Sequence, residues 1–170
     1  MRPPVYLAIL LLLLPVQAGL LAPLDRLGIR PDLGLAIVYT IGLLTGPGEA
    51  ALAGVAFGLL QDVGTASLLG FSGLTRGLVG LTAGVMGQRV LDVRSSSNSV
   101  FLFAFSIAES LLAALFLEAT WGDMPLGSLL IRQMLPRAFF TALAGYGILR
   151  LATRRNVPGL IMRHELQKER

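Results

Sequence analysis

The sequence predicts an all-α membrane protein with six transmembrane helices. Hydrophobic side chains make up 54% of its 170 residues and charged side chains only 14%, and the mean hydropathy is +0.73. Apolar runs separated by short polar connections recur along the whole chain. A water-soluble domain of this composition would expose too much apolar surface, so we expect lipid to be the main solvent.

Charge and cysteine content narrow the class of function. The net charge is +4, but six of the fourteen Lys and Arg residues lie within positions 150–170. This clustering suits a membrane surface rather than nucleic acid. The chain has no cysteine, so disulfide and thiol chemistry are excluded. We therefore expect membrane lipids as partners and no nucleic acid.

The first predicted helix covers residues 5–21, an apolar run of spanning length. The alternative is a cleaved signal peptide, because Val16-Gln17-Ala18 has the small residues that signal peptidase favours at its two key positions. The apolar residues 19–22 continue the run past that point. We therefore expect this helix to remain uncleaved.

The second and third predicted helices form a tight hairpin. Pro31 and Asp32 are suited to start a helix at residues 33–44. About 12 residues give only roughly 18 Å of helix, against a hydrocarbon core of about 30 Å. We expect Gly46-Pro47-Gly48 to form the turn and residues 50–63 to form the returning arm.

Three further helices are predicted after a loop at residues 64–72. They cover residues 74–90, 100–117 and 129–151, with hydrophilic loops at residues 90–99 and 118–125. The sequence thus predicts a six-helix membrane domain at residues 1–157 and a basic cytoplasmic tail at residues 158–170.

The distribution of charge predicts the orientation of these helices. With six spans, both termini lie on one side, and that side holds most of the basic residues. Because basic residues concentrate on the cytoplasmic side, we expect a multi-pass protein with both termini in the cytoplasm. The inner basic residues are Arg2, Arg89, Arg94, Arg150, Arg154, Arg155, Arg163, Lys168 and Arg170, whereas Asp25, Asp32, Asp62, Glu118 and Asp123 lie outside.

Two groups of polar side chains lie within the predicted helices. Gln61, Asp62 and Arg76 form a predicted polar centre, in which Asp62 and Arg76 are close enough to bridge the third and fourth helices. Glu109 and Arg137 lie at similar depth in antiparallel helices, so we expect an intramembrane ion pair. A structural pair that fixes helix register is favoured over a transport pathway.

Glycines four residues apart mark two stripes that would allow close helix packing in lipid. We expect the first stripe, Gly54 and Gly58, to serve packing within the fold. For the second, packing within the fold and contact with a partner helix both stay open. Its residues are Gly73, Gly77, Gly80 and Gly84.

The sequence favours a protein without a catalytic, cofactor or metal site. Gly70-Phe71-Ser72-Gly73 matches the G-x-S-G of rhomboid intramembrane proteases, but that serine needs a histidine base. The single histidine, His164, lies in the predicted tail, a membrane's width from Ser72. It has no cysteine or second histidine beside it for a metal site, so we interpret it as a solvated residue.

One set of positions within residues 31–87 carries a resemblance to a known family. These positions are Pro31, Asp32, Gly46, Pro47, Gly54, Gly58, Leu59, Leu60, Gln61, Asp62, Leu69, Gly70, Gly80 and Gly84. Together with the size of the chain and its six predicted helices, they resemble the MreD family of bacterial rod-shape-determining membrane proteins.

This resemblance implies a non-enzymatic scaffold subunit of the cell-elongation complex in the bacterial inner membrane. It implies binding to MreC and, indirectly, to MreB, RodA and the penicillin-binding partner of RodA. It also implies a fold similar to the substrate-binding subunits of energy-coupling-factor transporters. The alternative function is therefore a small-ligand, vitamin-like binding subunit of an importer, although the predicted polar centre offers few side chains for such a pocket.

Overall fold

The computed structural model describes residues 31–65, 70–89, 95–122 and 126–154, and these residues confirm the all-α prediction. The predicted first helix and the predicted tail lie outside them. Short connections join the helices, which are α3 (Leu33–Thr45), α4 (Pro47–Thr65), α5 (Phe71–Arg89), α6 (Ser97–Trp121), α7 (Leu126–Leu129), the π-helix η1 (Leu130–Met134) and α8 (Leu135–Arg154).

Among the described helices, one is long and apolar enough to cross a membrane. Its window, Ser97–Phe116 in α6, has a mean hydropathy of 2.0, and 28% of the window is buried. The other described helices fall short either in length or in apolar composition, so they do not support the predicted six spans. Helix α3 has 13 residues, and polar residues such as Gln61 and Arg76 lower the hydropathy of α4 and α5.

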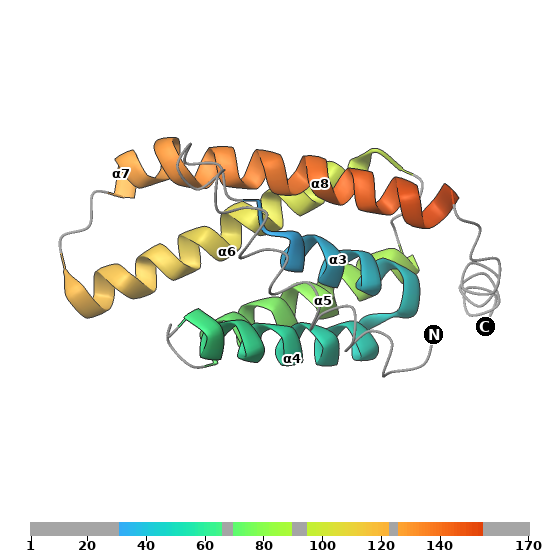
Figure 1. Ribbon diagram of the computed structural model, residues 1–170, viewed down its shortest axis with the longest axis horizontal. Coiled ribbons are helices and arrows are strands. Elements are labelled where there is room, and N and C mark those ends of the chain that lie inside the picture. The colour runs from blue at the N-terminus through green and yellow to red at the C-terminus, as the bar shows by residue number, and fades with distance from the viewer. Residues whose placement is uncertain (1–30, 66–69, 90–94, 123–125, 155–170) are drawn as a thin grey trace.

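Helix α3 occupies the centre of the fold, between a layer of α4 and α5 and a layer of α6 and α8 (Figure 1). It contacts all four of these helices, and almost every residue from Gly34 to Leu43 is buried. The helix starts at Asp32, whose side chain caps it, and ends at Gly46, whose φ of 108° turns the chain into α4. A short apolar helix is thus enclosed by longer ones.

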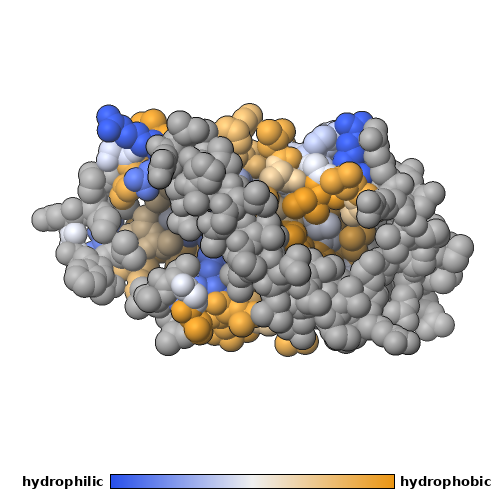
Figure 2. Space-filling view, viewed as in Figure 1, coloured by the Kyte–Doolittle hydropathy of each residue, from blue (hydrophilic) through white to orange (hydrophobic). Residues whose placement is uncertain are grey.

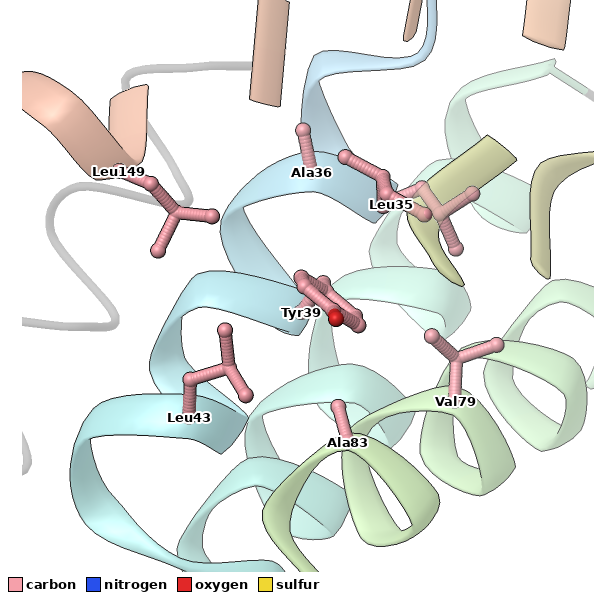
Figure 3. Close-up of a cluster of buried hydrophobic side chains, with 8 residues drawn as sticks. Leu35, Ala36, Tyr39, Leu43, Val79, Ala83 and Leu149 are labelled. Carbon is pink, nitrogen blue, oxygen red and sulfur yellow. The ribbon is translucent and has the colours of Figure 1, made fainter. Parts of the chain in front are cut away.

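The hydrophobic core forms where side chains of α3 meet those of α5, α6 and α8 (Figure 3). Tyr39 projects from the middle of α3, and its hydroxyl donates a 3.3 Å hydrogen bond to Oδ1 of Asn98 on α6. The tilted ring of Phe105 lies 6.0 Å from the Tyr39 ring. The buried residues of the core are Leu35, Ala36, Tyr39, Leu43, Val79, Ala83, Leu102 and Leu149.

Both glycine stripes serve packing within the fold. A Cβ on Gly54 would collide with the backbone of Arg76, and one on Gly58 with that of Ser72. In the second stripe, the same applies to Gly80 and Gly84, which lie on the backbones of Ala50 and Pro47.

The remaining two glycines of the second stripe face α4 as well. Gly73 lies against Leu59, and Gly77 lies against Val55. The hypothesis that a partner helix packs on Gly73, Gly77, Gly80 and Gly84 is therefore corrected, because α4 of the same chain occupies this face. The backbones of α4 and α5 approach so closely that only glycine leaves room between them.

The outer faces of the long helices are apolar. Leu52 and Val63 of α4, Leu74 of α5 and Phe139 of α8 are each more than half exposed. Figure 2 shows hydrophobic residues over much of the described surface on the face that it presents. Four charged side chains, by contrast, lie inside, since Asp32, Asp62, Arg76 and Glu109 are all buried, whereas Glu49, Arg132 and Arg150 are exposed. Buried charges beside exposed aliphatic side chains are unusual in a soluble protein.

Glycine packing gives the first testable prediction. Gly58→Ala should lower the free energy of unfolding by about 1–3 kcal/mol, because the added methyl group overpacks the α4–α5 contact. Gly147→Ala is the matched control, since a Cβ there meets no atom within 4 Å. The midpoint of thermal unfolding in detergent measures both variants. Equal midpoints would contradict the close α4–α5 contact.

Candidate functional site

Asp32 is the point at which the two layers of the fold are joined. Its Oδ1 accepts a 2.9 Å hydrogen bond from the backbone N–H of Leu35, which caps α3. Its Oδ2 accepts from Nη2 of Arg76 on α5 at 2.6 Å and from Nη2 of Arg137 on α8 at 2.8 Å. One carboxylate oxygen therefore holds two guanidinium groups from opposite sides of α3.

Arg76 links its own helix α5 to three others, α3, α4 and α6, and is only 1% exposed. Besides Asp32, its guanidinium donates a short hydrogen bond to Oε1 of Gln61 on α4. Its Nε lies 3.5 Å from Oε1 of Glu109 on α6. The guanidinium also stacks over the Phe57 ring, 4.9 Å from the centroid. A planar cation with several donors can make all of these contacts at once.

Glu109 belongs to the same cluster, but its ion-pair partner is not the one that the sequence predicted. The direct ion pair expected between Glu109 and Arg137 is replaced by two others, Glu109 with Arg76 and Arg137 with Asp32. Thr75 lies one residue before Arg76, and its hydroxyl is 3.5 Å from the Glu109 carboxylate. Glu109 and Arg137 do belong to one cluster. Their partners differ from the prediction because the rotation of each helix about its axis determines which side chains face each other.

Asp62 has a different role from the bridge to Arg76 that the sequence suggested. Its Oδ2 accepts hydrogen bonds from the backbone N–H groups of Gly70 at 2.8 Å and Ser72 at 3.1 Å. These donors lie at the start of α5, where backbone N–H groups have no partner within the helix. Asp62 therefore ties the end of α4 to the beginning of α5, and Gly70 assists with a φ of 96°.

Arg137 is placed by an unusual turn of helix. Pro136 has no N–H and its ring crowds the carbonyl of residue 132, and the chain just before it is wound as the π-helix η1. Thr141 then fixes the backbone, because its Oγ1 accepts from the N–H of Asp32 at 2.9 Å and donates to the carbonyl of Arg137 at 2.7 Å. Arg137 thus binds Asp32 directly through its side chain, and Thr141 connects their backbones.

The four charged groups form a neutral network. Two carboxylates, Asp32 and Glu109, balance the guanidinium groups of Arg76 and Arg137. Such a network can hold helices in one register, and arginine at neutral pH provides no proton to transfer. In the described part of the chain, no group of three or more His, Asp or Glu side chains is arranged to hold a metal ion. His164 lies outside the described residues.

Sequence reasoning missed Asp32 as a member of the cluster. It treated Asp32 as the start of a helix in an outer loop, which is correct for the cap but omits its second oxygen. The charges gave no signal for it, because Asp62 was assigned to Arg76 and Glu109 to Arg137, so each arginine already had a carboxylate. A buried guanidinium needs a counter-charge, but position along the helices does not show which carboxylate supplies it.

Comparisons of this chain with protein-family models, with curated proteins and with solved structures found no match.

The cluster gives the second prediction. Asp32→Asn keeps an oxygen for the Leu35 N–H but removes the charge that both arginines share. Breaking such buried pairs should cost about 3–5 kcal/mol of unfolding free energy. Glu109→Gln should cost less, because its ion pair with Arg76 is longer at 3.5 Å. Thermal unfolding in detergent measures both, with exposed Glu49→Gln as control. The assignment of Asp32 as the centre fails if Glu109→Gln is the more damaging substitution.

Proposed function

We propose that this chain is a multi-pass inner-membrane protein that acts as a non-enzymatic scaffold subunit of the bacterial cell-elongation complex and binds MreC. The observation that carries the proposal is the inverted distribution of polarity. Charged side chains are paired inside the helical bundle, while aliphatic side chains cover its outer faces. Lipid around the bundle accounts for both features.

Helix lengths support this placement. Helices α4 and α5 have 19 residues each, which corresponds to about 28 Å and is close to the roughly 30 Å of a hydrocarbon core. Helix α6 exceeds that length, and only 28% of its apolar window is buried, unlike the core helix of a soluble protein. Helix α3 is shorter, but four neighbouring helices enclose it, and Asp32 and Gly46 cap its ends.

The basic residues at the ends of the helices support the proposed orientation. Successive helices run in opposite directions, so the end of α5 lies on the same side as the end of α8 (Figure 1). Arg89 is the last residue of α5, and Arg150 and Arg154 lie in the last turns of α8. These basic residues favour the cytoplasm at this end, with both termini there.

The polar contacts favour a scaffold over the vitamin-like binding subunit of an importer. A ligand pocket needs polar side chains that point into it. Here Gln61 and Arg76 bond to each other, and Asp62 bonds to backbone N–H groups. The arrangement therefore uses the polar centre to hold helices together. It leaves the outer faces as the part of the molecule that can meet other proteins.

The resemblance to MreD supplies the identity of the complex. Several positions that carry this resemblance connect helices in the fold. Asp32 and Gln61 bind Arg76, and Gly54 and Gly58 allow α5 to pack closely on α4. MreC is the proposed direct partner. MreB, RodA and the penicillin-binding partner of RodA would be reached through it.

Topology gives the third prediction. A reporter that is active only in the periplasm should be silent when it is fused after Arg170, because the basic end of the chain stays in the cytoplasm. The same reporter should be active when it is fused at Asp123, after α6. Fusion levels are compared by immunoblot as the control. Activity at the C-terminus would contradict the proposed orientation.

Co-purification gives the fourth prediction. The tagged, full-length chain, extracted from native membranes in mild detergent, should retain MreC, because its outer faces remain free for a partner helix. An importer subunit would instead retain an ATPase coupling module. Mass spectrometry of the eluate separates the two. Recovery of the ATPase module without MreC would refute the scaffold proposal and favour the alternative.

A further inference from the structure

Helix α6 is held by different kinds of contact in its two halves. In the first half, Asn98 is buried and accepts a 3.3 Å hydrogen bond from the Tyr39 hydroxyl on α3. Leu102, about one turn later, is also buried and lies against Gly145 of α8. The first half of α6 is therefore fixed between α3 and α8.

The second half of α6 reaches α5 through the ends of side chains. The backbones of these two helices make little contact, unlike the glycine-packed backbones of α4 and α5. Phe116 is 43% exposed, and its ring centroid lies 5.6 Å from that of Phe71. Nearer the middle of α6, Oε1 of Glu109 lies 3.5 Å from Nε of Arg76 and 3.5 Å from the Thr75 hydroxyl. Glu109 and Phe116 thus connect this half of α6 to α5.

The contacts of Glu109 are long for a buried carboxylate. Charge-assisted hydrogen bonds from nitrogen are typically about 2.7–2.9 Å long. In the described part of the chain, Thr75 and Arg76 are the polar partners of this carboxylate. Arg76, in turn, already binds Asp32 at 2.6 Å and donates to Gln61. Arg76 would therefore keep its shortest ion pair if Glu109 moved away.

Arg137 of α8 is a second arginine at the level of Glu109. Glu109 follows Leu102 by seven residues and Arg137 precedes Gly145 by eight, so in these antiparallel helices the two residues lie at similar depth. The Nε atoms of Arg76 and Arg137 are both buried and, among the described residues, have no hydrogen-bond partner. Buried N–H groups without a partner are costly. Each guanidinium therefore has a donor that the Glu109 carboxylate can accept.

We propose that Glu109 exchanges between Arg76 and Arg137 and that the second half of α6 moves with it. In one arrangement, Glu109 holds α6 against the start of α5. In the other, Glu109 binds Arg137, and the second half of α6 turns away from α5 toward α8. Asp32 keeps both arginines in each arrangement, so the net charge of the cluster does not change. Two such arrangements make α6 a conformational switch, whichever protein is the partner of this chain.

Double electron–electron resonance between two spin labels measures this movement. The chain has no cysteine of its own, so labels attach only to introduced ones. Leu74→Cys with Leu112→Cys connects α5 to the second half of α6, and Val85→Cys with Val100→Cys connects α5 to the first half as the matched control. All four side chains are exposed. For the full chain in lipid nanodiscs, we expect two distances from the first pair and one from the control.

Two substitutions should shift the first pair in opposite directions. Arg137→Lys keeps a charge for Asp32 but lacks the Nε donor, so the population at the longer distance should fall roughly tenfold, the loss expected for one hydrogen bond to a charged group. Phe71→Leu removes the ring contact with Phe116, which exists only while α6 lies against α5. It should raise the longer-distance population roughly fivefold.

The other outcomes overturn the exchange. A single distance from the Leu74 and Leu112 pair in the unsubstituted chain shows that α6 does not move. A second distance that appears equally in the control pair indicates loosening of the whole bundle. A longer-distance population that Arg137→Lys leaves unchanged shows that Arg137 is not the second partner. If Arg137→Lys does not fold, Phe71→Leu decides, and an unchanged population there overturns the proposal.

Discussion

The attraction of two guanidinium groups to one carboxylate oxygen of Asp32 holds the described structure together. Arg76 approaches from the α4–α5 layer and Arg137 from the α6–α8 layer. Asp32 itself belongs to neither layer, because it caps the central helix α3. Removing its charge would leave both arginines without their shortest ion pair, and in a low-dielectric interior that loss is large.

Close packing of α4 and α5 makes this arrangement possible. Gly54 lies directly against the backbone of Arg76, so α4 comes near enough for Gln61 to reach the guanidinium and for Phe57 to stack on it. A larger residue at Gly54 would push α5 away and separate these groups. Glycine packing and charge pairing therefore depend on each other. The glycines let α4 and α5 approach closely, and this approach brings the hydrogen-bond donors and acceptors of the charge cluster within reach.

The exposed part of the cluster gives the fold an asymmetry. On the α4–α5 side, the charges are sealed by Phe57 and by the close helix pair. On the α8 side, Pro136 and the π-helix before it set a turn that leaves Arg137 partly outside. The described bundle therefore has a charged group, Arg137, at a surface that elsewhere carries exposed aliphatic side chains.

The amino-acid sequence by itself determined that the chain is helical, roughly where the described helices lie, and which side chains are charged within apolar surroundings. Periodicity and composition are local properties, so they can be interpreted without neighbours. The partners of those charges were decided only by the tertiary structure. Each residue rotates a helix position by about 100°, so similar depth along two helices does not determine which side chains face each other. For the same reason, the spacing of Gly73, Gly77, Gly80 and Gly84 indicated a packing face but not that α4 occupies it.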